Sequence, residues 1–218
     1  MASDPDLLAA VASGLSVATS LGYDSQSAAH DLYEAYVLTL LLEAARGDSW
    51  NWVLRDQSCN ITKHAVFRKG PGRLPTGNFT HALLTRPDKQ SLEAHIGVKV
   101  RGKSNISHEF DLLVLPSSAA QACRTSGADP TWQTVRGHAE AKYYAGDLPL
   151  PLGRAAVGLE RDCSLSGKSV VVTNQNGPTV EQLVTHYGIA FRFLIKPSNS
   201  AGLYYARLLF REILRNSA

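Results

Sequence analysis

Residues 108–115 read His-Glu-Phe-Asp-Leu-Leu-Val-Leu, and residues 140–142 read Glu-Ala-Lys. The first stretch predicts a buried strand that Pro116 ends. Asp111 opens its aliphatic run, where a carboxylate is costly unless it is paired or bound to a metal. Glu140 and Lys142 are two residues apart in a second predicted strand, so both side chains project from the same face. These two predicted strands therefore place ionisable side chains, Asp111, Glu140 and Lys142, in or beside the hydrophobic core.

The regular elements around these strands predict the fold class. Residues 92–100 alternate loosely and pair with 108–115 across a turn at 101–105, which predicts a β-hairpin. Further strands are predicted at 64–68, 138–144, 169–173 and 189–195, and helices at 25–46, 151–161, 178–187 and 201–215. This order predicts an α/β fold, with a mixed central sheet that is flanked by helices on both faces.

The chain is expected to form one domain over residues 25–218, preceded by a helical extension over residues 1–24. The helix of the extension covers 4–21, with a break at Gly14. In the domain, Ser25 or Ser27 is expected to cap the first helix, and Gly47 to end it.

Composition excludes several classes of protein. The 218 residues have a formal charge of +3, so any nucleic-acid footprint must be local. Three distant cysteines do not form a disulfide framework and fit a reducing compartment. The start carries acids where a signal peptide carries bases, and the longest apolar stretch, 35–42, is too short to cross a bilayer. We therefore expect a cytoplasmic protein with no membrane partner.

Glu34 is a third acidic residue in an unusual place. Its neighbours one and two turns later are Leu38 and Leu41, so it lies in the apolar stripe of the first helix. A glutamate on the core side of a helix needs a partner there.

Together these residues resemble the PD-(D/E)xK nuclease superfamily, whose fold is the restriction-endonuclease-like αβββαβ core. The resemblance covers residues 26–196. Asp111 matches the motif Asp, Glu140 and Lys142 match the (D/E)xK pair, and Glu34 matches an acid often found on the first helix. Phe110 departs from the family's Pro, at a position that varies widely.

The resemblance implies a Mg²⁺-dependent nuclease that hydrolyses DNA. Carboxylate oxygens are the hard ligands that Mg²⁺ prefers, so Asp111 and Glu140 would hold the ion, with Glu34 and the carbonyl of Ala141 completing its shell. Mn²⁺ is expected to substitute for Mg²⁺. Lys142 would orient the attacking water and stabilise the phosphoryl charge.

Other polar residues are candidate substrate contacts, each with a plainer alternative. Arg154 lies near the start of the helix that follows Lys142, and it would bind a phosphate or form a surface salt bridge. Gln175 follows a buried strand end, where turn chemistry is the alternative. Lys103 lies in the hairpin turn. Arg207 and Arg211 form a basic stripe with Arg215, which would track a phosphate backbone or form a solvated helix face.

Two other functions stay open. The fold could serve as a non-catalytic binding module. Residues 97–104 also match the P-loop pattern GxxxxGK[ST], but strand follows them where a P-loop needs a helix. A nuclease of this kind has no separate DNA-reading domain, so its specificity would come from loops, a homodimer or a protein partner. Glu93 and His95 share a strand face, and we assign them no role.

Overall fold

The computed structural model describes residues 5–15, 20–24 and 27–217 of the chain. The helices are α1 (Pro5–Leu15), α2 (Ala29–Arg46), α3 (Ser117–Ser126), α4 (Leu150–Cys163), α5 (Pro178–His186) and α6 (Ser200–Asn216), with a 3-10 turn at Trp132–Thr134. The strands are β1 (Ser20–Leu21), β2 (Asn51–Arg55), β3 (His64–Ala65), β4 (His81–Thr85), β5 (Leu92–Arg101), β6 (Ser107–Pro116), β7 (Gly137–Lys142), β8 (Ser169–Thr173) and β9 (Ala190–Arg192).

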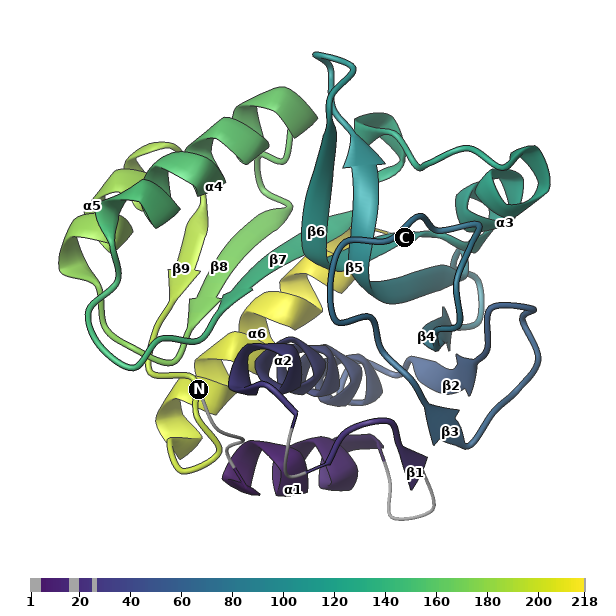
Figure 1. Cartoon of the computed structure of the whole chain (residues 1–218), viewed down its shortest axis with the longest axis horizontal. Helices are drawn as coiled ribbons and strands as arrows, with labels where there is room; N and C mark the ends of the chain where they lie inside the picture. The colour runs from purple at the N-terminus through teal and green to yellow at the C-terminus, as the bar shows by residue number, and fades with distance from the viewer. Residues whose placement is uncertain (1–4, 16–19, 25–26, 218) are drawn as a thin grey trace.

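Seven of these strands form one sheet in the order β2-β4-β5-β6-β7-β8-β9. Neighbouring strands are antiparallel from β2 to β7 and parallel from β7 to β9. β5 and β6 form the predicted hairpin, with Arg101 opposite Ser107 beside the turn. The prediction of an α/β fold with a mixed sheet flanked by helices is therefore confirmed (Figure 1).

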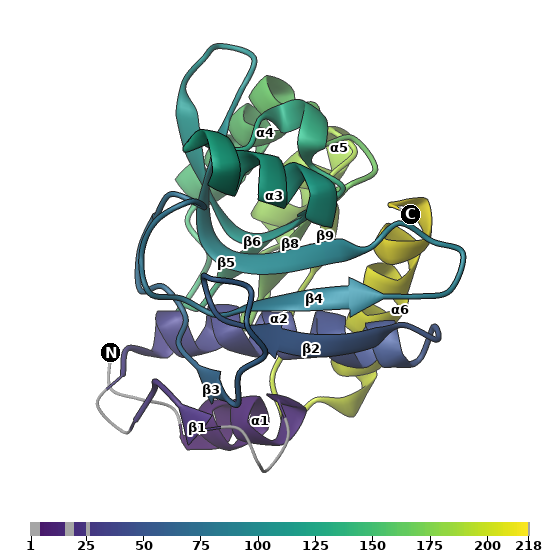
Figure 2. The same cartoon turned by 90° about the vertical axis from the view of Figure 1, so that its right-hand side faces the viewer.

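The sheet lies between two layers of helices, as Figure 2 shows. α2 and α6 cover one face with α1 outside them, and α3, α4 and α5 cover the other. α2 is buried almost all round, because α1 and α6 pack on it from one side and the sheet from the other. Leu7, Val11 and Leu15 of α1 belong to the same hydrophobic cluster as α2. Burial on all sides explains why the helix is apolar beyond a single stripe.

The N-terminal region differs from the sequence prediction. Residues 20–21 form β1 beside β3, so the helix predicted over 4–21 is wrong at its C-terminal end. The next helix begins at Ala29, and Ser27 does not cap it, because the Ser27 hydroxyl accepts a hydrogen bond from the Asp24 N–H. Ser25, the other expected cap, lies outside the described residues. Gly47 follows the end of the helix as expected.

Several short elements could not be recognised in the sequence. β2, β4 and α3 are not predicted by any pattern, since the two strands have only five residues each and α3 is rich in small polar residues. The strand expected at 189–195 is limited to β9, and Leu194 just beyond it has a φ of 54°, which is not a strand conformation.

The hairpin has a local irregularity beside Asp111. Ile96 and its partner Leu112 pack in the cluster under α2, whereas Val98 and its partner Phe110 pack in the cluster on the other face. Gly97 lies between these pairs with a φ of 61°. A Cβ on Gly97 would lie 3.1 Å from the Cβ of Arg68. The change of face therefore requires glycine at this position.

The P-loop pattern at residues 97–104 lies in this hairpin. β5 continues to Arg101 and the next element is β6, so a strand and not a helix follows the glycine, lysine and serine. Lys103 Nζ donates to the carbonyl of Arg161 at 3.3 Å, and Ser104 Oγ donates to Asp162 at 2.6 Å. The segment lacks the strand–loop–helix geometry that binds nucleotide phosphates.

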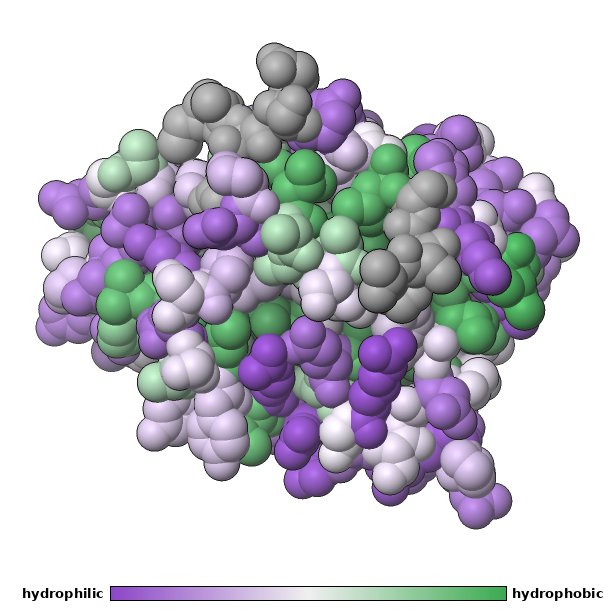
Figure 3. Space-filling model, turned by 90° about the horizontal axis from the view of Figure 1, so that it is seen from below, coloured by the Kyte–Doolittle hydropathy of each residue, from purple (hydrophilic) through white to green (hydrophobic). Residues whose placement is uncertain are grey.

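None of the described helices has the length and apolar character needed to cross a bilayer. On the side of α1, hydrophobic residues lie in separate groups among hydrophilic ones (Figure 3).

Gly97→Ala is expected to lower the free energy of unfolding by about 1–3 kcal/mol, because the new Cβ must adopt a left-handed backbone and meet Arg68. Urea denaturation measures this change. Gly146→Ala is the control, since its Cβ would meet no described atom within 4 Å. Equal stabilities of the two variants would contradict the strained position of Gly97.

Candidate active site

The candidate active site lies where β6 separates from β7. The ladder between these strands ends at the pair of Leu112 and Ala139. Asp111 comes next on β6, and its Oδ2 accepts a hydrogen bond from the Ala141 N–H at 2.9 Å. The carboxylate thus accepts a hydrogen bond from the Ala141 N–H of β7, which the backbone of β6 no longer reaches because the two strands diverge. Asp111 is 5% exposed, so the separation of the strands holds a buried carboxylate at the start of an open gap.

Lys142 joins two carboxylates in this gap. Its Nζ lies 2.6 Å from Oδ2 of Asp111 and 2.7 Å from Oε2 of Glu140. Glu140 and Lys142 project from the same face of β7, as their spacing predicts. The structure therefore brings Asp111, Glu140 and Lys142 together from two strands.

These side chains line a pocket of about 440 Å³. Its polar wall also includes Glu109, which is exposed. Tyr144 and residues of the loop and first turns of α4, namely Pro149, Pro151, Leu152, Ala155 and Ala156, form the opposite wall. The sequence patterns did not predict this wall, since they indicate only that a helix begins near Pro149 and Pro151.

The electrostatics of the pocket favour a cation. Burial, with the charge of Glu140, raises the pKa of Asp111 to about 6 despite the nearby ammonium. Burial lowers the pKa of Lys142, but the charges of Glu140 and Asp111 have the larger effect and raise this pKa above its ordinary value. Lys142 therefore carries its proton at neutral pH. Two carboxylates against one ammonium leave the site negative once Asp111 ionises.

Glu34 approaches the same site from α2. Burial raises its pKa to about 9, and the charges of Asp111 and Glu109 add to this effect, while Lys142 opposes it. The structure thus places Glu34 near the other carboxylates, although it does not line the pocket. At neutral pH and without a bound cation, its carboxyl group holds a proton.

His138 of β7 is a buried residue beside the site. His138 Nδ1 lies 3.1 Å from Ser169 Oγ, and its Nε2 lies 3.7 Å from Oε1 of Glu140. Burial lowers the pKa of His138 to about 3, so the ring is neutral. The ring also packs on Phe110, with centroids 4.3 Å apart. His138 Nε2 has no hydrogen-bond partner among the described residues, so the ring packs beside Glu140 as a neutral group and does not bond to it.

Gln175 acts on the pocket through Tyr144. Its amide donates to the Tyr144 carbonyl at 3.2 Å, and Asn174 bonds both the N–H and the carbonyl of Tyr144 at 2.8 Å. This arrangement matches the turn role that was the alternative for Gln175. It fixes the backbone of one pocket residue.

The other candidate substrate contacts lie outside the pocket. Arg154 is exposed on α4 and does not line it, and Lys103 lies at the hairpin turn over the Trp132 ring. Arg207 pairs with Glu43 at 2.7 Å, and Arg211 packs against Gly47. The basic stripe of α6 therefore packs along α2, and ion pairs within the chain already use part of its charge.

The donor set of the pocket fits a hard divalent cation. Asp111 and Glu140 offer carboxylate oxygens, and the repulsion between these two groups is what a cation would relieve. Ala141 lies between them on β7, with its N–H held by Asp111. These residues could hold Mg²⁺, and Lys142 could turn toward a substrate once a cation replaces it between the carboxylates.

Comparisons with known proteins found no family model, no curated protein and no solved structure that matches this chain.

Glu34→Gln is expected to stabilise the metal-free protein at pH 8 by at least about 1 kcal/mol and to change little at pH 4. The folded chain holds this proton up to a pKa of about 9, whereas the unfolded chain releases it near the ordinary value of 4.5. The carboxyl group therefore costs stability as pH rises through this window. Denaturation at both pH values measures the effect. The control Glu212→Gln, at an exposed residue of α6, should show no such dependence.

Proposed function

We propose that this chain is a Mg²⁺-dependent nuclease that hydrolyses phosphodiester bonds in DNA, with a restriction-endonuclease-like core. The observation that carries the proposal is the position of Lys142 Nζ, within 2.7 Å of both Asp111 and Glu140 beside an open pocket. Phosphodiester hydrolysis needs charge neutralisation at phosphorus and an activated water, and such a cluster can supply both.

The order of elements supports the proposal. When β2, β3 and β4, which lie between α2 and β5, and α3, which lies between β6 and β7, are set aside, the elements α2, β5, β6, β7, α4 and β8 give the pattern αβββαβ. Asp111 lies on the second of these strands, and the Glu-Ala-Lys segment lies on the third. Glu34 lies on the first helix. This placement agrees with the family resemblance carried by the same residues in the sequence.

Asp111 and Glu140 would hold the metal ion, with Glu34 and the carbonyl of Ala141 as further ligands. When bound, Mg²⁺ supplies charge neutralisation at the phosphate and lowers the pKa of a bound water. The same oxygen donors accept Mn²⁺, which is expected to support activity.

The protonated Lys142 would act as a hydrogen-bond donor. Its ammonium can orient the attacking water and stabilise the negative charge that builds up on the phosphoryl oxygens. Its raised pKa argues against a role as the base that takes a proton from the water. Tyr144 and the apolar wall from α4 would confine the substrate strand beside these groups.

Basic residues of the hairpin favour a polyanionic substrate. Lys99 lies close enough to the pocket to lower the pKa of Glu109, although burial and Asp111 raise it overall. Arg101 and Lys103 are exposed farther along the hairpin. These side chains would contact phosphates on either side of the cleaved bond. A homodimer or a protein partner would add sequence specificity to these phosphate contacts.

Asp111→Asn and Lys142→Ala are each expected to reduce Mg²⁺-dependent cleavage of plasmid DNA at least about 100-fold, because each removes a group that acts on the reacting phosphate. The conversion of supercoiled plasmid to nicked or linear forms measures the rate. Circular dichroism checks that the variants fold.

Asp88→Asn and Lys89→Ala are the matched controls, since both residues are exposed in the turn between β4 and β5. They should cleave like the wild type. Wild-type cleavage by either site variant, or a wild-type protein that cleaves neither DNA nor RNA with Mg²⁺ or Mn²⁺, would contradict the proposed function.

A further inference from the structure

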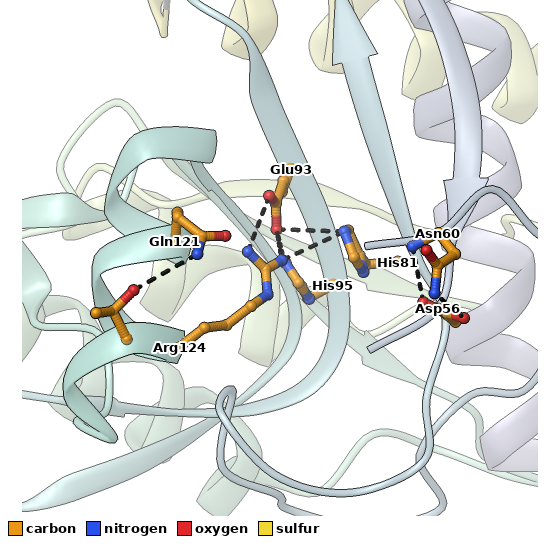
Figure 4. A network of polar contacts seen from close by, with 8 residues as sticks. Asp56, Asn60, His81, Glu93, His95, Gln121 and Arg124 are labelled. Atoms are coloured by element: carbon orange, nitrogen blue, oxygen red, sulfur yellow. Dashed lines mark hydrogen bonds and ion pairs between the residues drawn. The ribbon is translucent and has the colours of Figure 1, made fainter. Parts of the chain in front are cut away.

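A second cluster of potential metal ligands lies on the sheet face that α3 covers. His81 of β4 and Glu93 and His95 of β5 turn toward one another there (Figure 4). The two strands pair with Ala82 opposite Ala94 and Leu83 opposite Glu93, which places the two histidines side by side. Their rings stack with centroids 4.7 Å apart. The cluster is therefore fixed by a strand register and not by a loop.

The distances suit shared coordination of one ion. Oε2 of Glu93 lies 2.9 Å from Nε2 of His95 and 3.4 Å from Nε2 of His81, and one ligand atom from each residue lies within 4.8 Å of the others. A tetrahedral ion with bonds of about 2.1 Å places its ligands roughly 3.4 Å apart. The three side chains are thus near the spacing of a coordination shell.

The ionisation states are those of metal ligands. Burial lowers the pKa of His81 to about 3 and also lowers that of His95, so both imidazoles are neutral and each has one ring nitrogen without a proton. Burial would raise the pKa of Glu93, but hydrogen bonds from His95 and Arg124 bring it down to about 2. A metal ion binds neutral histidine and ionised carboxylate, so binding here releases no net proton. An ion on Nε2 of His95 requires the proton that this atom donates to Glu93 to move to Nδ1.

Arg124 of α3 now supplies the positive charge. Its Nη1 donates to Oε1 of Glu93 at 3.2 Å, and its Nη2 bonds to Oε2 of Glu93 and lies 3.3 Å from Nε2 of His81 (Figure 4). The guanidinium therefore contacts two of the three atoms that would bind an ion. A buried site with one carboxylate cannot hold both cations, so metal and guanidinium must exchange.

The cluster also has a route to solvent. Glu93 lines an open pocket of about 340 Å³ together with Arg55, Cys59, Ser117 and Gln121. Within the described residues, Nδ1 of His81 and Nδ1 of His95 have no hydrogen-bond partner. Each buried imidazole therefore has an unpaired Nδ1 in the present arrangement, and its Nε2 is the atom that faces Glu93.

We propose that His81, Glu93 and His95 bind one divalent transition-metal ion of the Zn²⁺ class, which displaces the Arg124 guanidinium. Two imidazoles and one carboxylate favour such an ion over Mg²⁺. The site is separate from the Asp111 pocket, which offers oxygen donors only, and it does not depend on the proposed nuclease activity.

The experiment titrates the full chain with Co²⁺ and then Zn²⁺ in excess Mg²⁺, following the visible absorption of bound Co²⁺ and its loss on Zn²⁺ addition. The expected result is one ion per chain. X-ray absorption of the zinc-loaded wild type should show imidazole ligands, which tests the site without any variant. A wild type without a saturable Co²⁺ spectrum, or a zinc shell without imidazole, would overturn the proposal.

Variants then assign the ligands. His95→Gln should weaken Co²⁺ binding at least about 100-fold, as loss of one of three protein ligands predicts, while His186→Gln, at an exposed residue of α5, should bind normally. Asp111→Asn should keep the spectrum. Loss of the spectrum in Asp111→Asn but not in His95→Gln would place the ion in the other pocket and overturn the proposal.

Arg124→Gln separates this site from a structural ion pair. Removal of the competing cation should tighten Co²⁺ binding at least about 10-fold, whereas a network without metal function would only lose stability. Unchanged or weaker binding in a folded Arg124→Gln protein would contradict the exchange of guanidinium and metal.

Discussion

The contact of one ammonium with two carboxylates organises the functional side of this molecule. Asp111 is buried, and it lies next to Glu140 at the point where two central strands separate. Two carboxylates in such a place repel each other and lose solvation, so they need a cation. Lys142 provides it with contacts of 2.6 and 2.7 Å. The same need supports the proposal that a divalent cation binds between these carboxylates.

The backbone prepares this arrangement. The side chains of the hairpin change face at Gly97. The ladder between β6 and β7 ends at Leu112 and Ala139, so a gap opens between two central strands and not at the edge of the sheet. Asp111 then replaces the lost ladder partner of Ala141. α2 brings Glu34 toward the gap from the helix layer on the other face, and the neutral His138 packs between Phe110 and Glu140. Each support comes from an element that is otherwise part of the core.

Much of this could be predicted from the sequence because it depends on local patterns. The run after Asp111, the two-residue spacing of Glu140 and Lys142 and the apolar stripe around Glu34 are all readable from period and alternation. The P-loop pattern could be set aside for the same reason, since a predicted strand follows it.

The sequence could not show contacts that depend on short or distant elements. His81 lies on β4, which no pattern predicts, so the pairing of Glu93 and His95 with a third ligand stayed hidden. The stripe of Arg207 and Arg211 is exposed in a helical projection, but Glu43 of α2 and Gly47, which follows that helix, lie against it.

The sheet face that α3, α4 and α5 cover thus carries two different donor sets, oxygen ligands beside α4 and imidazole ligands beneath α3. The central claim concerns the first. Crystals grown with Mn²⁺ test it most directly through anomalous scattering. We expect a peak bound by carboxylate oxygens of both Asp111 and Glu140, with Lys142 turned away from at least one of them. A map with no ion between these residues, and Lys142 still joined to both, would contradict the account.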